Sequence, residues 1–279
     1  MGNIHDMSQQ ASSLATYSAD LIDRSSVLDL ADQLLSDGVV IVKELLHHSE
    51  VAALRSALET ALAEDDALYG PDYKFRGMVH ALMTRGSSFI NLLGHAKVRL
   101  ISQSLIGHGC IIHAYNSSSM PPGASNYSRS IHVDSPRLVP GYITNIGMTI
   151  ALTPFTANNG GMSIIPGSFR RTTSPTEMEF SAQALQPPLD AGDMIVFNSR
   201  CWHRGGENHT DRWRHSVTLN VCRAYMRQQF DYPKMLEQLG ISDISDDIRQ
   251  FLGYYVRMPI SLAEFQLPAA QRPYRPGQE

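Results

Sequence analysis

The sequence is poor in two features that would each mark a particular class of protein. Its three cysteines, Cys110, Cys201 and Cys222, are too few and too irregularly spaced for a disulfide framework, and an odd count leaves at least one thiol unpaired. Its 23 basic residues are outnumbered by 27 acidic ones, so the net charge is −4 and there is no cationic footprint for nucleic acid. We therefore expect a reducing, cytoplasmic location and a small-molecule partner.

Long hydrophobic runs are also missing. No uncharged stretch approaches the roughly 20 residues that cross a bilayer, and the first two dozen residues contain no apolar segment of the secretory type. We therefore expect no membrane association. With 43% hydrophobic and 18% charged residues, the 279-residue chain has the ordinary composition of a folded globular protein.

The chain begins with a helix, a strand and a second helix. Residues 26–29 (SVLD) match a capping box ahead of apolar residues at helical spacing, and this helix should end at Gly38. Residues 39–42 are β-branched and predict a short strand, and Ser49 then opens a second amphipathic helix.

From about residue 107 the pattern changes to short apolar or alternating runs between Pro, Gly and Asn clusters, which is typical of an antiparallel barrel or jelly roll. The last 50 residues look helical. No linker splits the chain, so we expect a flexible leader over residues 1–24 and a single domain over residues 25–279. The expected strands in this part are residues 110–115, 143–152, 162–165, 193–198 and 217–222.

Two candidate metal ligands stand two residues apart in the segment 130–134 (SIHVD), which has strand character. Alternate residues of a strand point to one face, so His132 and Asp134 can reach the same point. His203, just after the expected strand 193–198, is the third candidate. Two imidazoles and one carboxylate form the facial triad that suits Fe(II) and leaves coordination positions open. A lone HxD is a weak signal in a chain with 11 histidines.

A second signal follows His203. The guanidinium of Arg214 can pair bidentately with a carboxylate, such as the distal one of 2-oxoglutarate. Ser216 lies two residues later on the same expected strand face and could add a hydroxyl to that carboxylate. The alternative for Arg214 is a surface ion pair with Asp211 or Glu207.

Taken together, the motifs resemble the phytanoyl-CoA dioxygenase family of Fe(II)/2-oxoglutarate-dependent oxygenases, over roughly residues 31–225. Arg214 stands about eleven residues after His203, which is the usual family offset. The segments that carry the resemblance are 37–42 (DGVVIV) for the opening strand, 132–134 (HVD), 159–168 (NGGMSIIPGS) for the family's NG…PGSH segment, and 191–193 (AGD) before the strand that precedes the distal histidine.

The resemblance implies a mainly β fold with flanking helices, a double-stranded β-helix of the jelly-roll, cupin-like type with the metal in its mouth. It implies a dioxygenase that uses Fe(II), 2-oxoglutarate and O2 and releases succinate and CO2, with no catalytic residue beyond the metal centre. The implied metal ligands are His132, Asp134 and His203, and the implied co-substrate residues are Arg214 with Ser216, Asn116 and Thr149.

Two positions depart from the family pattern. Phe169 replaces the histidine of PGSH, which changes packing rather than chemistry. Arg129 stands where some members carry a glutamine near the site, so it is a candidate substrate contact, with a solvated loop position as the alternative. Asp134 separates the chain from halogenating relatives, whose small residue there frees a site for chloride. Cys201, beside His203, is interpreted as a small buried thiol and not as a ligand.

The expected reaction is hydroxylation of a small metabolite, with a natural-product intermediate of secondary metabolism as the favoured class. Desaturation, epimerisation and cyclisation remain open. The polar loop 117–129 could act as a lid and residues 170–184 as another wall, and neither has the cationic cluster that a CoA thioester needs. The alternatives are a cupin-like metalloenzyme that does not use 2-oxoglutarate and a non-catalytic barrel that binds a small ligand. The oligomeric state is left open, with a homodimer as one candidate.

Overall fold

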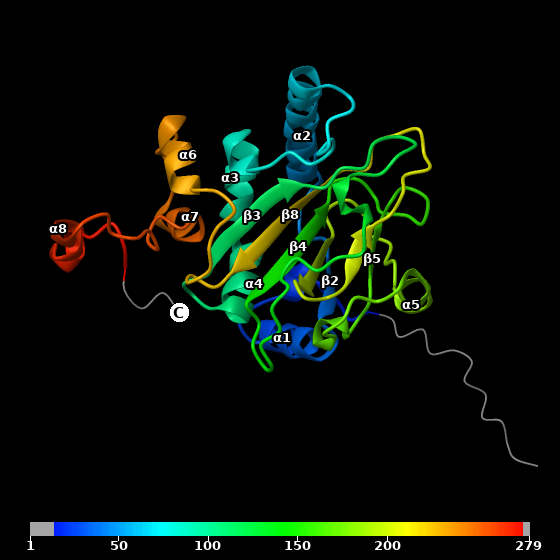
Figure 1. Cartoon of the computed structure of the whole chain (residues 1–279), viewed down its shortest axis with the longest axis horizontal. Helices are drawn as coiled ribbons and strands as arrows, with labels where there is room; N and C mark the ends of the chain where they lie inside the picture. The colour runs from blue at the N-terminus through cyan, green and yellow to red at the C-terminus, as the bar shows by residue number, and fades with distance from the viewer. Residues whose placement is uncertain (1–13, 276–279) are drawn as a thin grey trace, which may run out of the picture.

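A computed structural model describes residues 14–275, in which helices pack around two facing β-sheets (Figure 1). The strands and helices expected from the sequence are present, with ends shifted by a few residues, except that residues 130–134 form no regular strand. The strands are β1 (Thr16–Ser18), β2 (Val39–Lys43), β3 (Ile111–Ser117), β4 (Asn145–Ala151), β5 (Met162–Ile164), β6 (Met194–Asn198), β7 (His203–Gly205) and β8 (Ser216–Cys222). The helices are α1 (Ser26–Asp37), α2 (His48–Tyr69), α3 (Ser87–Leu93), α4 (Ala96–Ile106), α5 (Glu177–Gln183), α6 (Tyr232–Gln238), α7 (Asp246–Phe251) and α8 (Leu262–Phe265).

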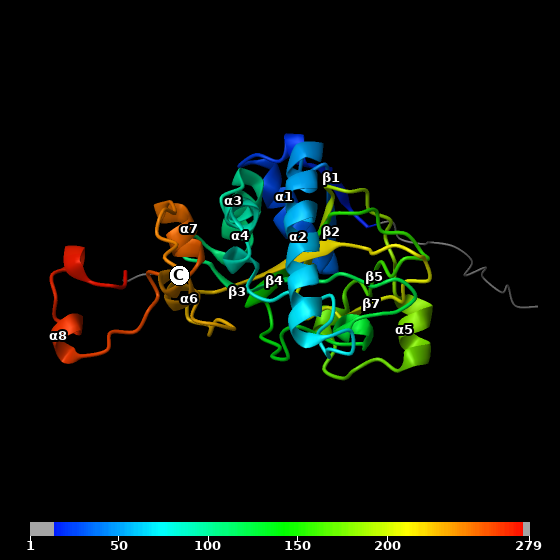
Figure 2. The same cartoon turned by 90° about the horizontal axis from the view of Figure 1, so that it is seen from above.

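The larger sheet has the strand order β1-β2-β6-β4-β8-β3, and the smaller sheet pairs β5 with β7. Neighbouring strands of the larger sheet are antiparallel, except that β1 runs parallel to β2. Because the neighbours are distant in sequence, the chain crosses between the sheets repeatedly, as the jelly-roll prediction requires. Figure 2 shows α1, α3 and α4 on one side of the larger sheet, with β5, β7 and α5 on the other.

The outer face of the larger sheet is apolar across all its central strands. Val196 on β6, Met148 on β4 and Leu219 on β8 lie side by side in register and are fully buried. They belong to the main hydrophobic core, which also contains Leu30 and Leu34 of α1. Burial of this face holds the helices against the sheet.

The inner face changes from apolar to polar along a single row of the ladder. Ile41 and Ile195 begin the row, and Thr149, Thr218 and Asn116 complete it in register. The smaller sheet packs on the apolar half of this face, in a second hydrophobic cluster that includes its β5 residues. The polar half is therefore left as the wall of a cavity.

Two local expectations need correction. Residues 1–13 of the expected leader lie outside the described residues, but residues 16–18 form β1, because their backbone pairs with the free edge of β2. The capping box at residues 26–29 does not form, since the Asp23 carboxylate already accepts the backbone N–H groups of Ser25 and Ser26 at 2.8 and 2.9 Å. The first helix does end at Gly38, whose left-handed φ of 76° closes it as predicted.

No helix within residues 14–275 is both long enough and apolar enough to cross a membrane.

Candidate active site

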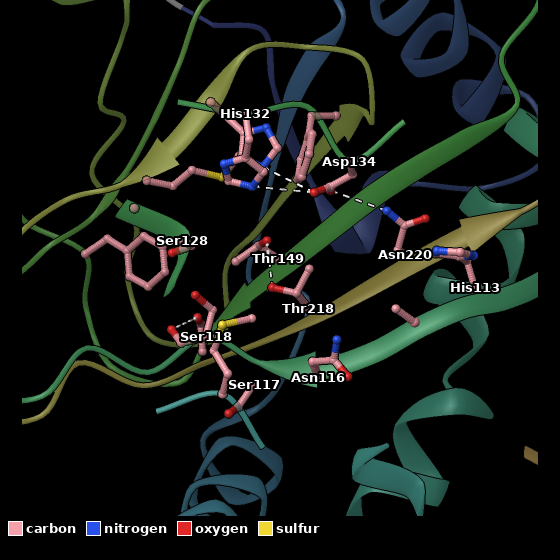
Figure 3. Close-up of a pocket in the computed structure, with 18 of the residues that line it drawn as sticks. His113, Asn116, Ser117, Ser118, Ser128, His132, Asp134, Thr149, Thr218 and Asn220 are labelled. Atoms are coloured by element: carbon pink, nitrogen blue, oxygen red, sulfur yellow. Dashed lines mark hydrogen bonds and ion pairs between the residues drawn. The ribbon is translucent and has the colours of Figure 1, made fainter. Parts of the chain in front are cut away.

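The structure brings His132, Asp134 and His203 together. Figure 3 shows His132 and Asp134 side by side in the wall of the cavity. One ligand atom from each residue lies within 4.8 Å of the other two. Asp134 Oδ1 is 3.6 Å from His132 Nε2 and 3.8 Å from His203 Nε2. The three side chains therefore converge on one point, as the spacing of the residues predicted.

The backbone geometry around His132 differs from the expected strand. Residues 130–134 form no regular strand, and His132 makes a single isolated bridge to His203, in which each N–H donates to the other's carbonyl at 3.0 Å. The Asp134 N–H then donates to the Ser199 carbonyl at 2.9 Å. One bridge and one further hydrogen bond hold the two segments in register without a continuous ladder.

Hydrogen bonds to the backbone select the same tautomer in both histidines. His132 Nδ1 is 2.7 Å from the Ser130 carbonyl, and His203 Nδ1 is 2.9 Å from the Cys201 carbonyl. A carbonyl can only accept, so Nδ1 carries the hydrogen and Nε2 keeps its lone pair for a metal. Burial lowers the pKa of His203 to about 4, which keeps this ring neutral near pH 7.

A chain of amides orients the carboxylate of Asp134. Asn220 Nδ2 lies 3.3 Å from Asp134 Oδ2 and 3.2 Å from Ser199 Oγ, and the Asn220 oxygen accepts from Asn145 Nδ2 at 2.9 Å. Asn220 and Asn145 are almost fully buried. Asp134 therefore turns Oδ1 towards the two imidazoles while Oδ2 is held by an amide.

Arg214 is buried in the same cavity, with only 2% of its surface exposed. Its Nη1 donates to the Ser118 carbonyl at 2.7 Å and to Ser216 Oγ at 2.8 Å, and its Nη2 donates to the Gly160 carbonyl at 2.8 Å. The guanidinium lies 4.4 Å from the centre of the Phe155 ring, and Nε has no partner within the described residues.

No carboxylate within residues 14–275 forms an ion pair with Arg214, so the alternative of a surface pair with Asp211 or Glu207 is wrong. Burial lowers the pKa of Arg214 to about 9, so the group is still cationic near pH 7. A buried, unpaired cation is unfavourable unless an anion joins it.

The cavity that joins the triad to Arg214 has a volume of about 220 Å³. Three other residues named from the sequence, Ser216, Asn116 and Thr149, line it, and Thr149 Oγ1 lies 3.0 Å from Thr218 Oγ1. Arg129 does not line this cavity; it is exposed in a groove on the outer side of His132 and Asp134. The donor set and the unpaired arginine thus fit a divalent metal and a dicarboxylate held side by side.

Of the two segments expected to enclose the site, one lines the cavity and the other does not. The start of the loop 117–129 forms part of the cavity wall, where Met120 and Arg214 exchange backbone hydrogen bonds at 2.8 and 3.1 Å. The expectation that residues 170–184 form another wall is wrong, because every one of these residues is described and none lines the cavity. Their helix instead buries Phe180 beneath Arg204 of the smaller sheet.

The interpretation of Cys201 as a small buried thiol is confirmed. Its Sγ donates to the Gly38 carbonyl at 3.3 Å, and burial raises the pKa of the thiol to about 12. Phe169, at the position of the family histidine, packs against the same glycine, where an added Cβ would lie 2.5 Å from the ring. Both side chains pack in the second hydrophobic cluster, and neither lines the cavity.

Sequence reasoning missed several residues that line the cavity, among them the polar residues Asn220, His113 and Gln229. Asn220 lies four residues after Ser216 on the same strand, so the alternation that identified Ser216 could have identified it. His113 is placed by an irregularity in β3, and Gln229 comes from the segment after β8. No local pattern indicates these last two.

Comparison with known proteins identifies related sequences over most of the chain. The family profile of phytanoyl-CoA dioxygenase (PhyH) matches residues 34–216. The protein Rv1501 of Mycobacterium tuberculosis is 27% identical over 267 residues, which cover 92% of this chain and 98% of that protein. The dioxygenase aneA of Aspergillus aculeatus is 24% identical over 71% of this chain and 73% of its own length.

Solved structures confirm the fold. The α-ketoglutarate-dependent non-haem epimerase SnoN from nogalamycin biosynthesis superposes with a TM-score of 0.59 at 20% identity, covering 72% of this chain and 85% of SnoN. One of its structures contains Fe3+ and α-ketoglutarate. The predicted double-stranded β-helix with flanking helices is therefore the fold of this chain.

Proposed function

Because the chain belongs to the phytanoyl-CoA dioxygenase family of iron- and 2-oxoglutarate-dependent oxygenases, we propose that it hydroxylates a small-molecule metabolite. The proposed metal ligands are Nε2 of His132, Nε2 of His203 and the carboxylate of Asp134. The proposed anchor of the co-substrate is Arg214, with the Ser216 hydroxyl beside it. Residues 25–279 are proposed to form one catalytic domain.

This proposal rests on the burial of Arg214 and on the absence of a negatively charged partner for it among the described residues. A cationic side chain that is 98% buried, bonded only to neutral oxygens and open to the same cavity as the triad, lacks its counter-charge. The distal carboxylate of 2-oxoglutarate supplies such a charge, and a guanidinium binds a carboxylate more strongly than it binds a carbonyl. A simple metal-binding barrel would have no use for this buried cation.

Iron and 2-oxoglutarate together would supply the chemistry, in which O2 and 2-oxoglutarate are converted to CO2 and succinate while one oxygen atom enters a C–H bond of the substrate. The protein's residues perform binding and orientation. The backbone carbonyls of Ser130 and Cys201 hold the two imidazoles in the ligand tautomer, and Asn220 holds the carboxylate. Thr149 and Asn116 line the wall beside the proposed 2-oxoglutarate position.

A natural-product substrate is the proposed class. SnoN, which shares the fold, comes from the biosynthesis of nogalamycin, and aneA is named as a dioxygenase of a filamentous fungus. The three free, buried cysteines agree with the proposed cytoplasmic location. A natural-product role predicts that the substrate is itself the product of another enzyme. We therefore do not expect to find it among the free amino acids that are commonly used in substrate screens.

The test is to add Fe(II) and 2-oxoglutarate anaerobically to the metal-free protein and to record the visible charge-transfer absorption of the chelate that they form. We expect a band in the wild type and its loss in Arg214→Met, which keeps the length of the side chain and removes its charge. Arg257→Met is the matched control, because Arg257 forms only an exposed pair with Glu237 at 3.4 Å. A wild type that binds metal but shows no band would favour the cupin-like enzyme that does not use 2-oxoglutarate.

A further inference from the structure

The edge strand β3 carries a bulge that adds one polar side chain to the cavity. Ile112 pairs with Val221 and Ala114 pairs with Asn220, so His113 is the extra residue between two consecutive pairs. A bulge re-aims the side chains next to it, and bulges are frequent beside active sites. His113 consequently lines the cavity, and Figure 3 shows it on β3, across the cavity from His132.

The segment after β8 holds His113 in this position. The Gln229 N–H and the Tyr232 hydroxyl both donate to the His113 carbonyl, at 2.8 and 3.1 Å. His113 Nδ1 lies 2.8 Å from the Arg227 carbonyl. Because that carbonyl can only accept, Nδ1 carries a hydrogen and Nε2 is the ring nitrogen left for a ligand.

Two amides stand beside this imidazole on the cavity wall. Asn116 accepts from the Ala81 N–H at 3.3 Å through Oδ1 and donates through Nδ2 to Gln229 Oε1 at 3.3 Å. The side-chain oxygen of Gln229 therefore accepts a hydrogen bond, whereas the N–H groups of its side-chain amide have no partner within the described residues. The wall thus presents free donors on Gln229 beside the unused Nε2 of His113.

The two permanently charged side chains of the cavity are already assigned to the metal and to 2-oxoglutarate. Of its lining residues, only Asp134 and Arg214 belong to the permanently charged types, and the proposed function assigns the first to the metal and the second to 2-oxoglutarate. No Lys, Glu or second Arg lines it among residues 14–275. An ionic group of a substrate would enter this space without a counter-charge, which is unfavourable in a partly desolvated cavity.

We infer that His113, Asn116 and Gln229 form a subsite for an uncharged hydrogen-bonding group of the substrate, such as a hydroxyl or a carboxamide. Such a group can accept from the Gln229 amide while it donates to His113 Nε2. This inference rests on the proposed function, because it requires Arg214 to be occupied by 2-oxoglutarate. The part of the substrate that occupies this subsite is therefore neutral, and carboxylate or ammonium analogues are rejected.

The experiment uses four probes of matched size: 4-fluorobenzamide, 4-fluorobenzyl alcohol, 4-fluorobenzoate and 4-fluorobenzylammonium. Their binding to the full chain loaded with Zn(II) and 2-oxoglutarate is followed by fluorine NMR, since zinc supports no turnover. We expect binding of the amide and the alcohol and rejection of both ions. Gln229→Leu and His113→Phe should each weaken amide binding about fivefold, the effect of one lost hydrogen bond. Gln266→Leu, at an exposed glutamine after α8, is the matched control.

The outcomes separate this inference from the proposed function. 2-Oxoglutarate binding is measured in the same sample by calorimetry, and its absence would contradict the proposed function before any probe is added. With 2-oxoglutarate bound, 4-fluorobenzoate that binds as tightly as 4-fluorobenzamide would overturn the subsite. Unchanged amide binding in both Gln229→Leu and His113→Phe would also overturn it.

Discussion

Gly147 on β4 lies directly beneath the ring of Phe197 on β6. The two residues are paired in register, and a Cβ built on Gly147 would lie 2.2 Å from Phe197 Cζ. The ring of Phe197 in turn packs 4.8 Å from the ring of His203, centre to centre. The missing side chain at position 147 therefore makes room for the aromatic ring that supports the distal histidine.

The substitution Gly147→Ala should displace Phe197 and loosen His203. We expect a loss of about 1–3 kcal/mol in the free energy of unfolding, as for other overpacked cores, together with weaker metal binding. Urea unfolding and calorimetric titration with Fe(II) measure the two effects. The second substitution Phe197→Leu should restore part of both in the double variant, and a double variant no better than Gly147→Ala would contradict this account.

Asn220 is predicted to tune the metal through Asp134. Replacing it with leucine removes the amide that holds Oδ2, and such losses typically weaken metal affinity by about 10- to 100-fold. The fold should survive, because leucine has a similar volume and the site faces a cavity. Asn158→Ala, at an exposed loop position, is the control. Equal metal affinity in Asn220→Leu and in the wild type would show that the amide has no part in orienting the carboxylate.

The convergence of His132, Asp134 and His203 was predictable because it depends on spacing and on one family pattern. The predicted regular strand at residues 130–134 does not form, and a single bridge between His132 and His203 is enough to bring the ligands together. Burial and partners were not predictable. Nothing local in the sequence distinguishes a buried, unpaired Arg214 from one on the surface, because its isolation depends on Gly160, 54 positions away.

His215 is predicted to make folding sensitive to acid. Burial, with smaller contributions from Arg214 and Arg55, lowers the pKa of His215 to about 4, below the 6.5 of an unperturbed histidine. Between these values the unfolded chain binds a proton that the folded chain does not, so stability is complete above pH 6.5 and falls as the pH drops towards 4. This group alone should reduce stability by about 2 kcal/mol from pH 7.5 to pH 5.

The measurement is urea unfolding of the metal-free protein at both pH values, in the wild type and in His215→Gln. His203 has a similarly lowered pKa and contributes to both proteins, so the comparison isolates His215. We expect a shallower pH dependence in the variant. Identical slopes in the two proteins would mean that His215 is protonated in the folded state, despite its ring lying stacked 5.9 Å from Trp213.

The orientation of His113 on the substrate side of the cavity could not be predicted from the sequence pattern. Alternation along β3 from Asn116 would place His113 on the opposite face, and the bulge after Ile112 reverses that assignment. The bulge is stabilised by hydrogen bonds from residues 228 and 229, more than one hundred positions away. Contacts of that range are fixed by the folded chain and leave no local signature.

Arg214 is proposed to bind the distal carboxylate of 2-oxoglutarate beside the metal. The anaerobic Fe(II) protein is titrated with 2-oxoglutarate and with 2-oxopentanoate, which has the same chelating end but no distal carboxylate. The wild type should bind 2-oxoglutarate about 10- to 100-fold more tightly, as expected for hydrogen bonds between charged groups. Arg214→Met should bind both compounds equally. A preference for 2-oxoglutarate that survives in Arg214→Met would contradict the claim.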